Sequence, residues 1–186
     1  YAGARPERIR RLINLEGFGL ASTRPSQAPG RYAKWLNEVK AARQGELNLR
    51  TYKDSEAVAQ RLIKTNPRLS LDKALWLAQH WSKPNAQGEW EILGHPAHKV
   101  INPYLFRVEE MLAIYQSISA PVLNVEASEN DLEKWWQGKY KLEEFHERLK
   151  SIKDIRSVTI AQAGHMMHHD QPLDLAQHIE AFLQHT

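Results

Sequence analysis

Two short apolar segments, residues 121–126 (PVLNVE) and 157–160 (SVTI), flank a longer segment from 131 to 152 in which Phe145, Leu149 and Ile152 share one helical face. Short apolar runs are typical of buried strands, and the longer periodic segment is typical of an amphipathic helix. A strand, a helix and a second strand in this order imply a right-handed crossover between parallel strands. The sequence therefore predicts an α/β fold with a parallel sheet in this part of the chain.

The segments outside this unit fit the same fold class. Residues 10–17 (RRLINLEG) form a mostly apolar run that stops at a glycine, as a buried parallel strand does. Residues 172–184 predict a closing helix, with its large apolar residues on one face. Residues 1–6 (YAGARP) have the character of a helix tail with no N-cap before it, so we expect the chain to begin inside its fold.

From about residue 21 to residue 119 the pattern is mainly helical and strand patterns are scarce. Residues 32–39 carry an apolar face, Asp54 and Ser70 are expected N-caps of two further helices, and Asn102-Pro103 is expected to start another helix that continues through Tyr115. Glycines and a proline interrupt the periodicity between 85 and 101, which indicates an irregular or hairpin connection.

Composition excludes several classes of protein. The chain has 186 residues and a formal charge of +3 from 25 basic and 22 acidic residues, which are mixed along its length. This mixing argues against nucleic-acid binding. The absence of cysteine excludes disulfides and fits a reducing compartment, so we expect a cytoplasmic location. No apolar run approaches the roughly 18 residues that span a bilayer, so no membrane association is expected.

The chemistry is expected just beyond the carboxyl ends of the predicted strands, where parallel α/β sheets place their ligands. Three polar positions lie there: Glu16 after the first strand, residues 126–131 after the second, and Gly164-His165 after the third. A histidine after the last strand and a carboxylate after an earlier strand are two of the three members of a hydrolytic triad. The missing member is the nucleophile.

Three stretches resemble the α/β-hydrolase superfamily, and together they span the chain. Residues 1–16 (YAGARPERIRRLINLE) resemble the helix and strand that follow the family's Gly-x-Ser-x-Gly elbow, and residues 120–125 (APVLNV) resemble the strand before its usual acid. Residues 163–172 (AGHMMHHDQP) resemble the catalytic-histidine loop and are the most specific of the three.

The resemblance implies the C-terminal part of an α/β-hydrolase parallel sheet with an inserted helical cap. Residues 1–20 and 120–186 would form the core, and residues 21–119 the cap. His165 would be the general base. The nucleophile would lie roughly nine residues before Tyr1. None of the serines within the chain has the strand–elbow–helix setting that exposes a nucleophile.

The triad acid has more than one candidate, because the place of the family's usual aspartate holds Asn130. Asp131 is one residue further on, although it could equally be the N-cap of the next helix. Glu16 matches the position of the acid in some family members, including certain haloalkane dehalogenases, although it could also be a polar strand-end residue. Glu129 is a third candidate.

The expected function is hydrolysis of an ester or related acyl bond in a small-molecule substrate by a Ser-His-acid triad, without a cofactor. Two alternatives remain open: a haloalkane dehalogenase or epoxide hydrolase with an aspartate nucleophile, and a non-catalytic ligand-binding protein on the same scaffold. The isolated chain is expected to be inactive. Its exposed strand edge is expected to associate with the missing N-terminal half or with a second copy.

The remaining histidines, tryptophans and methionines give weaker indications of a metal site or a binding pocket. His165, His168, His169 and Asp170 lie on one tight loop and cannot all converge on a single ion, so no metal site is expected. The six tryptophans and the pair Met166 and Met167 are expected either to pack the core or to line a pocket.

Overall fold

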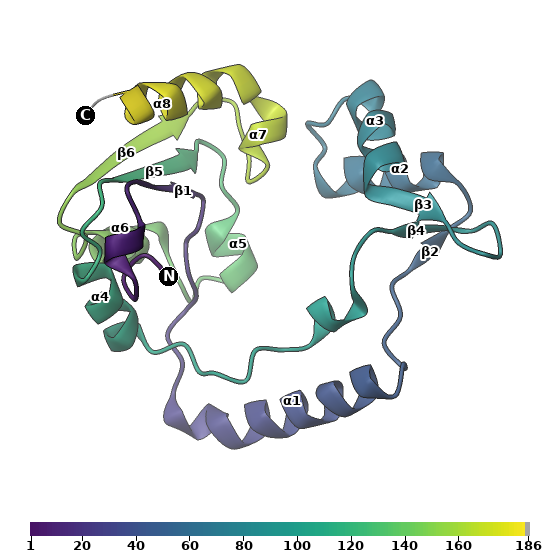
Figure 1. Ribbon diagram of the computed structural model, residues 1–186, viewed down its shortest axis with the longest axis horizontal. Coiled ribbons are helices and arrows are strands. Elements are labelled where there is room, and N and C mark those ends of the chain that lie inside the picture. The colour runs from purple at the N-terminus through teal and green to yellow at the C-terminus, as the bar shows by residue number, and fades with distance from the viewer. Residues whose placement is uncertain (185–186) are drawn as a thin grey trace. The chain divides into compact units, whose positions relative to one another are not determined.

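The structure is a computed structural model that describes residues 1–184 (Figure 1). The chain divides into two compact units. Unit 1 contains residues 1–23 together with the chain from Phe106 onward, and unit 2 contains Arg24–Leu105. Each unit has its own hydrophobic core.

Unit 1 is built on a three-stranded parallel sheet in the order β1-β5-β6 (Figure 1). The strands are β1 (Leu12–Leu15), β5 (Val122–Ala127) and β6 (Ile155–Ile160). All six residues of β5 are buried, as expected of a central parallel strand with both faces covered. The predicted α/β class and the three predicted strands are confirmed.

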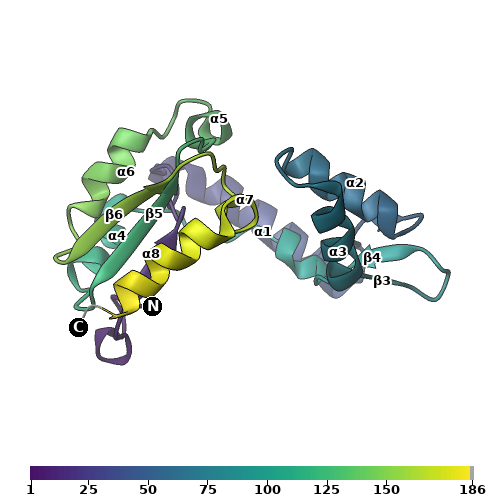
Figure 2. The same ribbon diagram turned by 90° about the horizontal axis from the view of Figure 1, so that it is seen from above.

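Helices cover both faces of this sheet (Figure 2). On one face, Leu123 and Val125 pack with residues of α7 (Met167–Asp170) and of α8 (Pro172–Gln184), including Met167 and Phe182. On the other face, Val122 packs with residues of α5 (Leu132–Trp136) and α6 (Leu142–Leu149), and with Ile118, which follows α4 (Val108–Gln116). The alternation along β5 thus separates two apolar layers.

Two predictions for unit 1 were wrong in detail. The single helix predicted from 131 to 152 is broken into α5 and α6, because Gln137 and Gly138 adopt left-handed φ angles of 51° and 71° that end α5. The helix tail predicted at residues 1–6 is instead a turn closed on the carbonyl oxygen of Tyr1, followed by the short 3-10 helix η1 (Pro6–Arg8). Pro6 disfavours helical geometry at Arg5, which has a φ of −139°.

Unit 2 contains η2 (Pro25–Gln27), α1 (Ala28–Arg43), α2 (Ser55–Thr65), α3 (Leu71–Trp81) and η3 (Pro96–Lys99). A small antiparallel sheet joins β2 (Thr51–Tyr52), β4 (Trp90–Ile92) and β3 (Ser82–Pro84) (Figure 1). Both predicted caps are present, because Asp54 accepts from the Ala57 amide at 2.7 Å and Ser70 accepts from the Lys73 amide at 3.3 Å. The connection between 85 and 101 contains the expected hairpin, formed by β3 and β4.

The insertion is shorter in the structure than in the sequence prediction. Its boundaries lie at Thr23/Arg24 and Leu105/Phe106 instead of 20/21 and 119/120. The Asn102 side chain accepts from the Tyr104 amide in a local turn, and the helix predicted from Asn102 begins only at Val108. Tyr115 and Ile118 then pack into the sheet core of unit 1. The role of unit 2 as a lid over a pocket stays a prediction.

Within residues 1–184, none of the helices is both long enough and apolar enough to traverse a bilayer.

Candidate functional site

A carboxylate and an imidazole meet beyond the carboxyl ends of the strands of unit 1. Glu16 directly follows β1, and His165 follows β6 in the loop before α7. Glu16 Oε2 lies 2.9 Å from His165 Nδ1. The pair joins two segments that are far apart in the sequence but end at the same edge of the sheet.

The backbone at Glu16 turns its side chain under the neighbouring strand. Glu16 has a φ of +49°, which is in the left-handed region, and its amide donates to the carbonyl of Val125 at 2.9 Å. Its Oε1 atom accepts from the Ala127 amide at 2.8 Å, and its side chain is fully buried. The carboxylate is thus fixed by one hydrogen bond to β5 and by a second to His165.

His165 is held from three sides. Glu16 binds Nδ1, Asp170 Oδ2 accepts from the amide of the preceding Gly164 at 2.9 Å, and the Trp135 ring lies edge-on with its centroid 4.7 Å from the imidazole. The His165 side chain is still 45% exposed. With Nδ1 occupied, Nε2 is the nitrogen that can exchange a proton with a bound reactant.

The rival acids lie in other surroundings. Asp131 is exposed, and its Oδ1 atom forms an ion pair with Lys134 Nζ at 3.6 Å. It occupies the N-cap position of α5, but its side chain does not accept a capping hydrogen bond. Asn130 Oδ1 accepts from the Leu132 amide at 3.3 Å, and Glu129 is exposed, with its backbone amide bonded to the Ala163 carbonyl. Of the proposed acids, Glu16 is the one that the structure brings to His165.

The segment after Glu16 is tied to α6 and the turn before it. The Tyr140 hydroxyl donates to the Phe18 carbonyl at 2.6 Å, and the buried Arg148 donates to the Leu20 carbonyl at 2.7 Å. The Arg148 guanidinium lies over the Tyr140 ring, 4.2 Å from its centroid. Burial raises the pKa of Tyr140 to about 12, although the Arg148 charge acts in the opposite direction.

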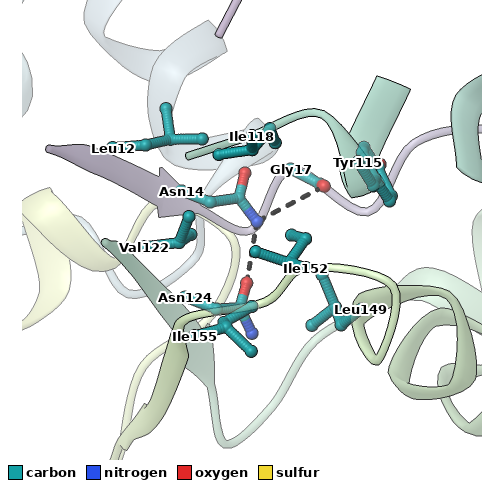
Figure 3. Close-up of a pocket in the computed structure, with 10 residues that line it drawn as sticks. All are labelled: Leu12, Asn14, Gly17, Tyr115, Ile118, Val122, Asn124, Leu149, Ile152 and Ile155. Carbon is teal, nitrogen blue, oxygen red and sulfur yellow. Dashed lines mark hydrogen bonds between the residues drawn. The ribbon is translucent and has the colours of Figure 1, made fainter. Parts of the chain in front are cut away.

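A set of polar residues on the other side of β5 from Leu123 and Val125 was not predicted. Asn14, Asn124 and Glu126 occupy alternate positions of β1 and β5, and they are joined by hydrogen bonds to one another and to His146. Asn14 and Asn124 border a cavity of about 90 Å³ with otherwise mostly apolar walls (Figure 3). Polar residues at every second position of apolar strands were the sequence signal for this set.

Among residues 1–184, no three or more His, Asp or Glu side chains lie close enough together to hold a metal ion. His168 and His169 lie with their ring centroids 4.1 Å apart, and Met167 is buried in the sheet core. Packing is therefore the observed role of Met167.

Neither a family model nor a curated protein matches the sequence. Solved structures do match it. A hypothetical protein from Pseudomonas aeruginosa aligns with a TM-score of 0.76 and 22% identity, covering 98% of this chain and 61% of that one. A thioesterase domain from the curacin biosynthetic pathway has a TM-score of 0.72 and 20% identity, covering 96% and 60%.

An alpha/beta hydrolase from Novosphingobium aromaticivorans has a TM-score of 0.62 and 15% identity, covering 100% of this chain and 60% of that one. The chain therefore spans about 60% of the length of these similar structures. Over this shared part, the chain has the α/β-hydrolase fold.

Proposed function

With the α/β-hydrolase fold as premise, we propose that the chain is the C-terminal part of a serine hydrolase that cleaves an ester or a related acyl bond. In this proposal His165 is the general base and Glu16 is the acid that orients it. The observation that carries the proposal is the 2.9 Å contact between the buried Glu16 carboxylate and His165 Nδ1.

The arrangement suits proton transfer at one nitrogen. Glu16 holds the imidazole in the tautomer with hydrogen on Nδ1, which leaves Nε2 free of a proton. Nε2 then takes the proton from the nucleophile as it attacks the acyl carbon, and returns that proton to the leaving group. As positive charge develops on the imidazole, the buried carboxylate stabilises it.

The remaining parts of the site belong, in this proposal, to the full-length protein. The nucleophile and the backbone amides of the oxyanion hole lie outside these 186 residues. The substrate class is a small acyl compound; the neighbour described as a thioesterase domain supports including thioesters among the compounds tested. Unit 2 is the proposed lid that determines which acyl group fits.

The position of Glu16 also fits an enzyme with an aspartate nucleophile, since certain haloalkane dehalogenases carry their acid after the corresponding strand. The two chemistries differ in the atom that attacks: a serine forms an acyl-enzyme, whereas an aspartate forms an alkyl-enzyme ester. Labelling by a fluorophosphonate probe separates them, because the probe phosphonylates an activated serine hydroxyl.

The decisive experiment compares Glu16→Gln with the matched control Asp131→Asn in the full-length protein, using p-nitrophenyl and thioester substrates. We expect Glu16→Gln to lower kcat by about 10³–10⁴-fold, because the wrong imidazole tautomer is favoured. Asp131→Asn should leave kcat within about threefold of the wild type, as for an exposed ion pair.

Three results would count against the proposal. Loss of turnover in Asp131→Asn with an active Glu16→Gln variant would reassign the acid. Turnover of haloalkanes or epoxides without fluorophosphonate labelling would favour the aspartate nucleophile. Saturable binding of acyl ligands with no turnover in the wild type would indicate a non-catalytic protein on the hydrolase scaffold.

A further inference from the structure

We propose that Asn14 is a positioning residue for Glu16, and that it is held in place by a hydrogen-bond chain that starts at Glu126 and passes through Asn124. The role assigned to Glu16 rests on the proposed function. The physical coupling between Asn14 and the Glu16–His165 pair does not depend on the proposed function, and it can be measured in the 186-residue chain itself.

The chain of hydrogen bonds crosses the sheet in register. Asn14 of β1 is paired with Asn124 of β5, and the Asn14 Nδ2 atom donates to Asn124 Oδ1 at 2.7 Å. Asn124 Nδ2 donates to Glu126 Oε1 at 2.7 Å. His146 Nε2 of α6 lies 2.9 Å and 3.1 Å from the two oxygens of Glu126. Asn124 is fully buried, and Glu126 is 7% exposed.

The orientation of both amides follows from the carboxylate at the end of the chain. An ionised carboxylate only accepts hydrogen bonds, so Asn124 must present its amino group to Glu126 and its oxygen to Asn14. Asn14 must therefore also present its amino group, which leaves the Asn14 oxygen on the side of Gly17. One charged group thus fixes the rotamer of a side chain two positions before Glu16.

Asn14 lies directly against the turn that carries Glu16 (Figure 3). Its Nδ2 atom is 3.4 Å from the Gly17 carbonyl oxygen, and a Cβ atom added to Gly17 would lie 2.0 Å from Asn14 Oδ1. No side chain fits between them, so the backbone at Gly17 rests on the Asn14 amide. Because the preceding Glu16 is held at a φ of +49°, a support on the inside of the turn limits its relaxation.

The surroundings make a purely packing role for Asn14 a poor explanation. The cavity beside it is walled by apolar side chains, including Leu12, Val122 and Ile155 (Figure 3). A leucine at position 14 would match these neighbours without the desolvation of an amide. The cost of burying the Asn14 amide is offset if its directed hydrogen bonds fix a local geometry that an apolar side chain would not fix.

The test uses the 186-residue chain with ¹⁵N-labelled histidine. Long-range ¹H–¹⁵N spectra in alkaline buffer give the ratio of the Nδ1–H to the Nε2–H tautomer of His165, which is assigned by its loss in His165→Asn. In Asn14→Leu and in Asn14→Ala we expect this ratio to fall by up to about tenfold, the change produced by losing one charge-assisted hydrogen bond.

Two variants of Glu126 provide the rescue. Glu126→Gln keeps an oxygen that can accept from Asn124, but its amino group can also donate, so the His165 tautomer ratio should lie between that of the wild type and that of Glu126→Leu. Glu126→Leu removes this acceptor and should change the ratio in the same direction as Asn14→Leu. Ser157→Ala is the matched control, since the Ser157 hydroxyl contacts Asn124 at 3.5 Å but lies at the far side from Glu16.

An unchanged tautomer ratio in folded Asn14→Leu or Asn14→Ala overturns the proposal. So does loss of the fold in both variants, because Asn14 would then be a residue of fold stability alone. If Glu126→Gln and Glu126→Leu give the same His165 tautomer ratio, the hydrogen-bond chain from Glu126 through Asn124 does not position Asn14, and the proposal is wrong. Absence of hydrolysis by the full-length protein, with the tautomer shifts as expected, would refute the proposed function and leave this coupling intact.

Discussion

Glu16 contributes to stability in three ways: by its charge beside His165, by its hydrogen bond to the Ala127 amide and by its left-handed backbone. Replacing Glu16 by glutamine, alanine and glycine in turn separates these three contributions. The glutamine side chain can still accept from the Ala127 amide, but it cannot offer a charge to His165. Because the His165 side chain is 45% exposed, we expect Glu16→Gln to lower the free energy of unfolding of unit 1 by only about 0–1 kcal/mol.

The alanine variant also removes the acceptor of the Ala127 amide, which is bonded to Glu16 Oε1 at 2.8 Å in a buried position. An orphaned buried amide costs about 1–3 kcal/mol, so Glu16→Ala should be less stable than Glu16→Gln by that amount. Glycine lacks the side chain as well, but it adopts the φ of +49° without the steric penalty of a Cβ atom. Glu16→Gly should therefore be about 1 kcal/mol more stable than Glu16→Ala.

The assay is urea unfolding followed by the backbone amide signals of β5 and β6, which report on unit 1 separately from unit 2. The free energy of unfolding should decrease in the order wild type, Glu16→Gln, Glu16→Gly, Glu16→Ala. This order holds when the cost of leaving the Ala127 amide unpaired exceeds the steric cost of a Cβ atom at the left-handed φ. Equal stability of the glutamine and alanine variants would show that Glu16 does not serve the Ala127 amide. An alanine variant more stable than the glycine variant would refute the left-handed backbone at Glu16.

Three further outcomes are expected. Tyr140→Phe should lower the free energy of unfolding of unit 1 by about 1–3 kcal/mol, because the buried Phe18 carbonyl loses its donor. The folded-state pKa of Tyr140 is raised from 10.0 to about 12, so its contribution to the free energy of unfolding is present below pH 10 and is lost as the pH rises through 12. In Tyr140→Phe, the free energy of unfolding should therefore fall less steeply between these two pH values. The Ala57 amide lowers the pKa of Asp54, so the stabilisation of α2 by Asp54 is present above the usual carboxyl pKa and is lost as the pH falls through the lowered value. Asparagine at this position should still cap α2, but Asp54→Asn should remove this acid dependence. Amide exchange in α2, measured between those two pH limits, tests the prediction. The purified 186-residue chain should give no turnover of a p-nitrophenyl ester, because the proposed nucleophile and oxyanion amides lie outside it, and turnover abolished by Glu16→Gln would contradict that assignment.

Much of unit 1 could be predicted from local pattern. The strands at 122–127 and 155–160 and the helix at 172–184 were predictable because their apolar periodicity, turn residues and length all agree. The division of 131–152 into two helices was not, since it depends on left-handed backbone at Gln137 as well as at a glycine. The extent of the insertion was also beyond local pattern: the helix at 108–116 has the same periodicity whether it packs on the sheet or elsewhere.

For the candidate site, the sequence by itself determined the residue types and the strand ends at which they stand: His165 after the last strand, with carboxylates at Glu16 and Asp131 after earlier ones. It could not choose between the two carboxylates, because each lies in the segment that follows a strand and nothing local shows which segment approaches the histidine. Only the tertiary structure decided which one meets His165. The parallel register of β1 and β5 and the left-handed turn at Glu16 bring its carboxylate onto the Ala127 amide and the imidazole, whereas Asp131 faces solvent and Lys134. A hydrogen bond between residues 149 positions apart depends on strand pairing, which no local stretch of sequence contains.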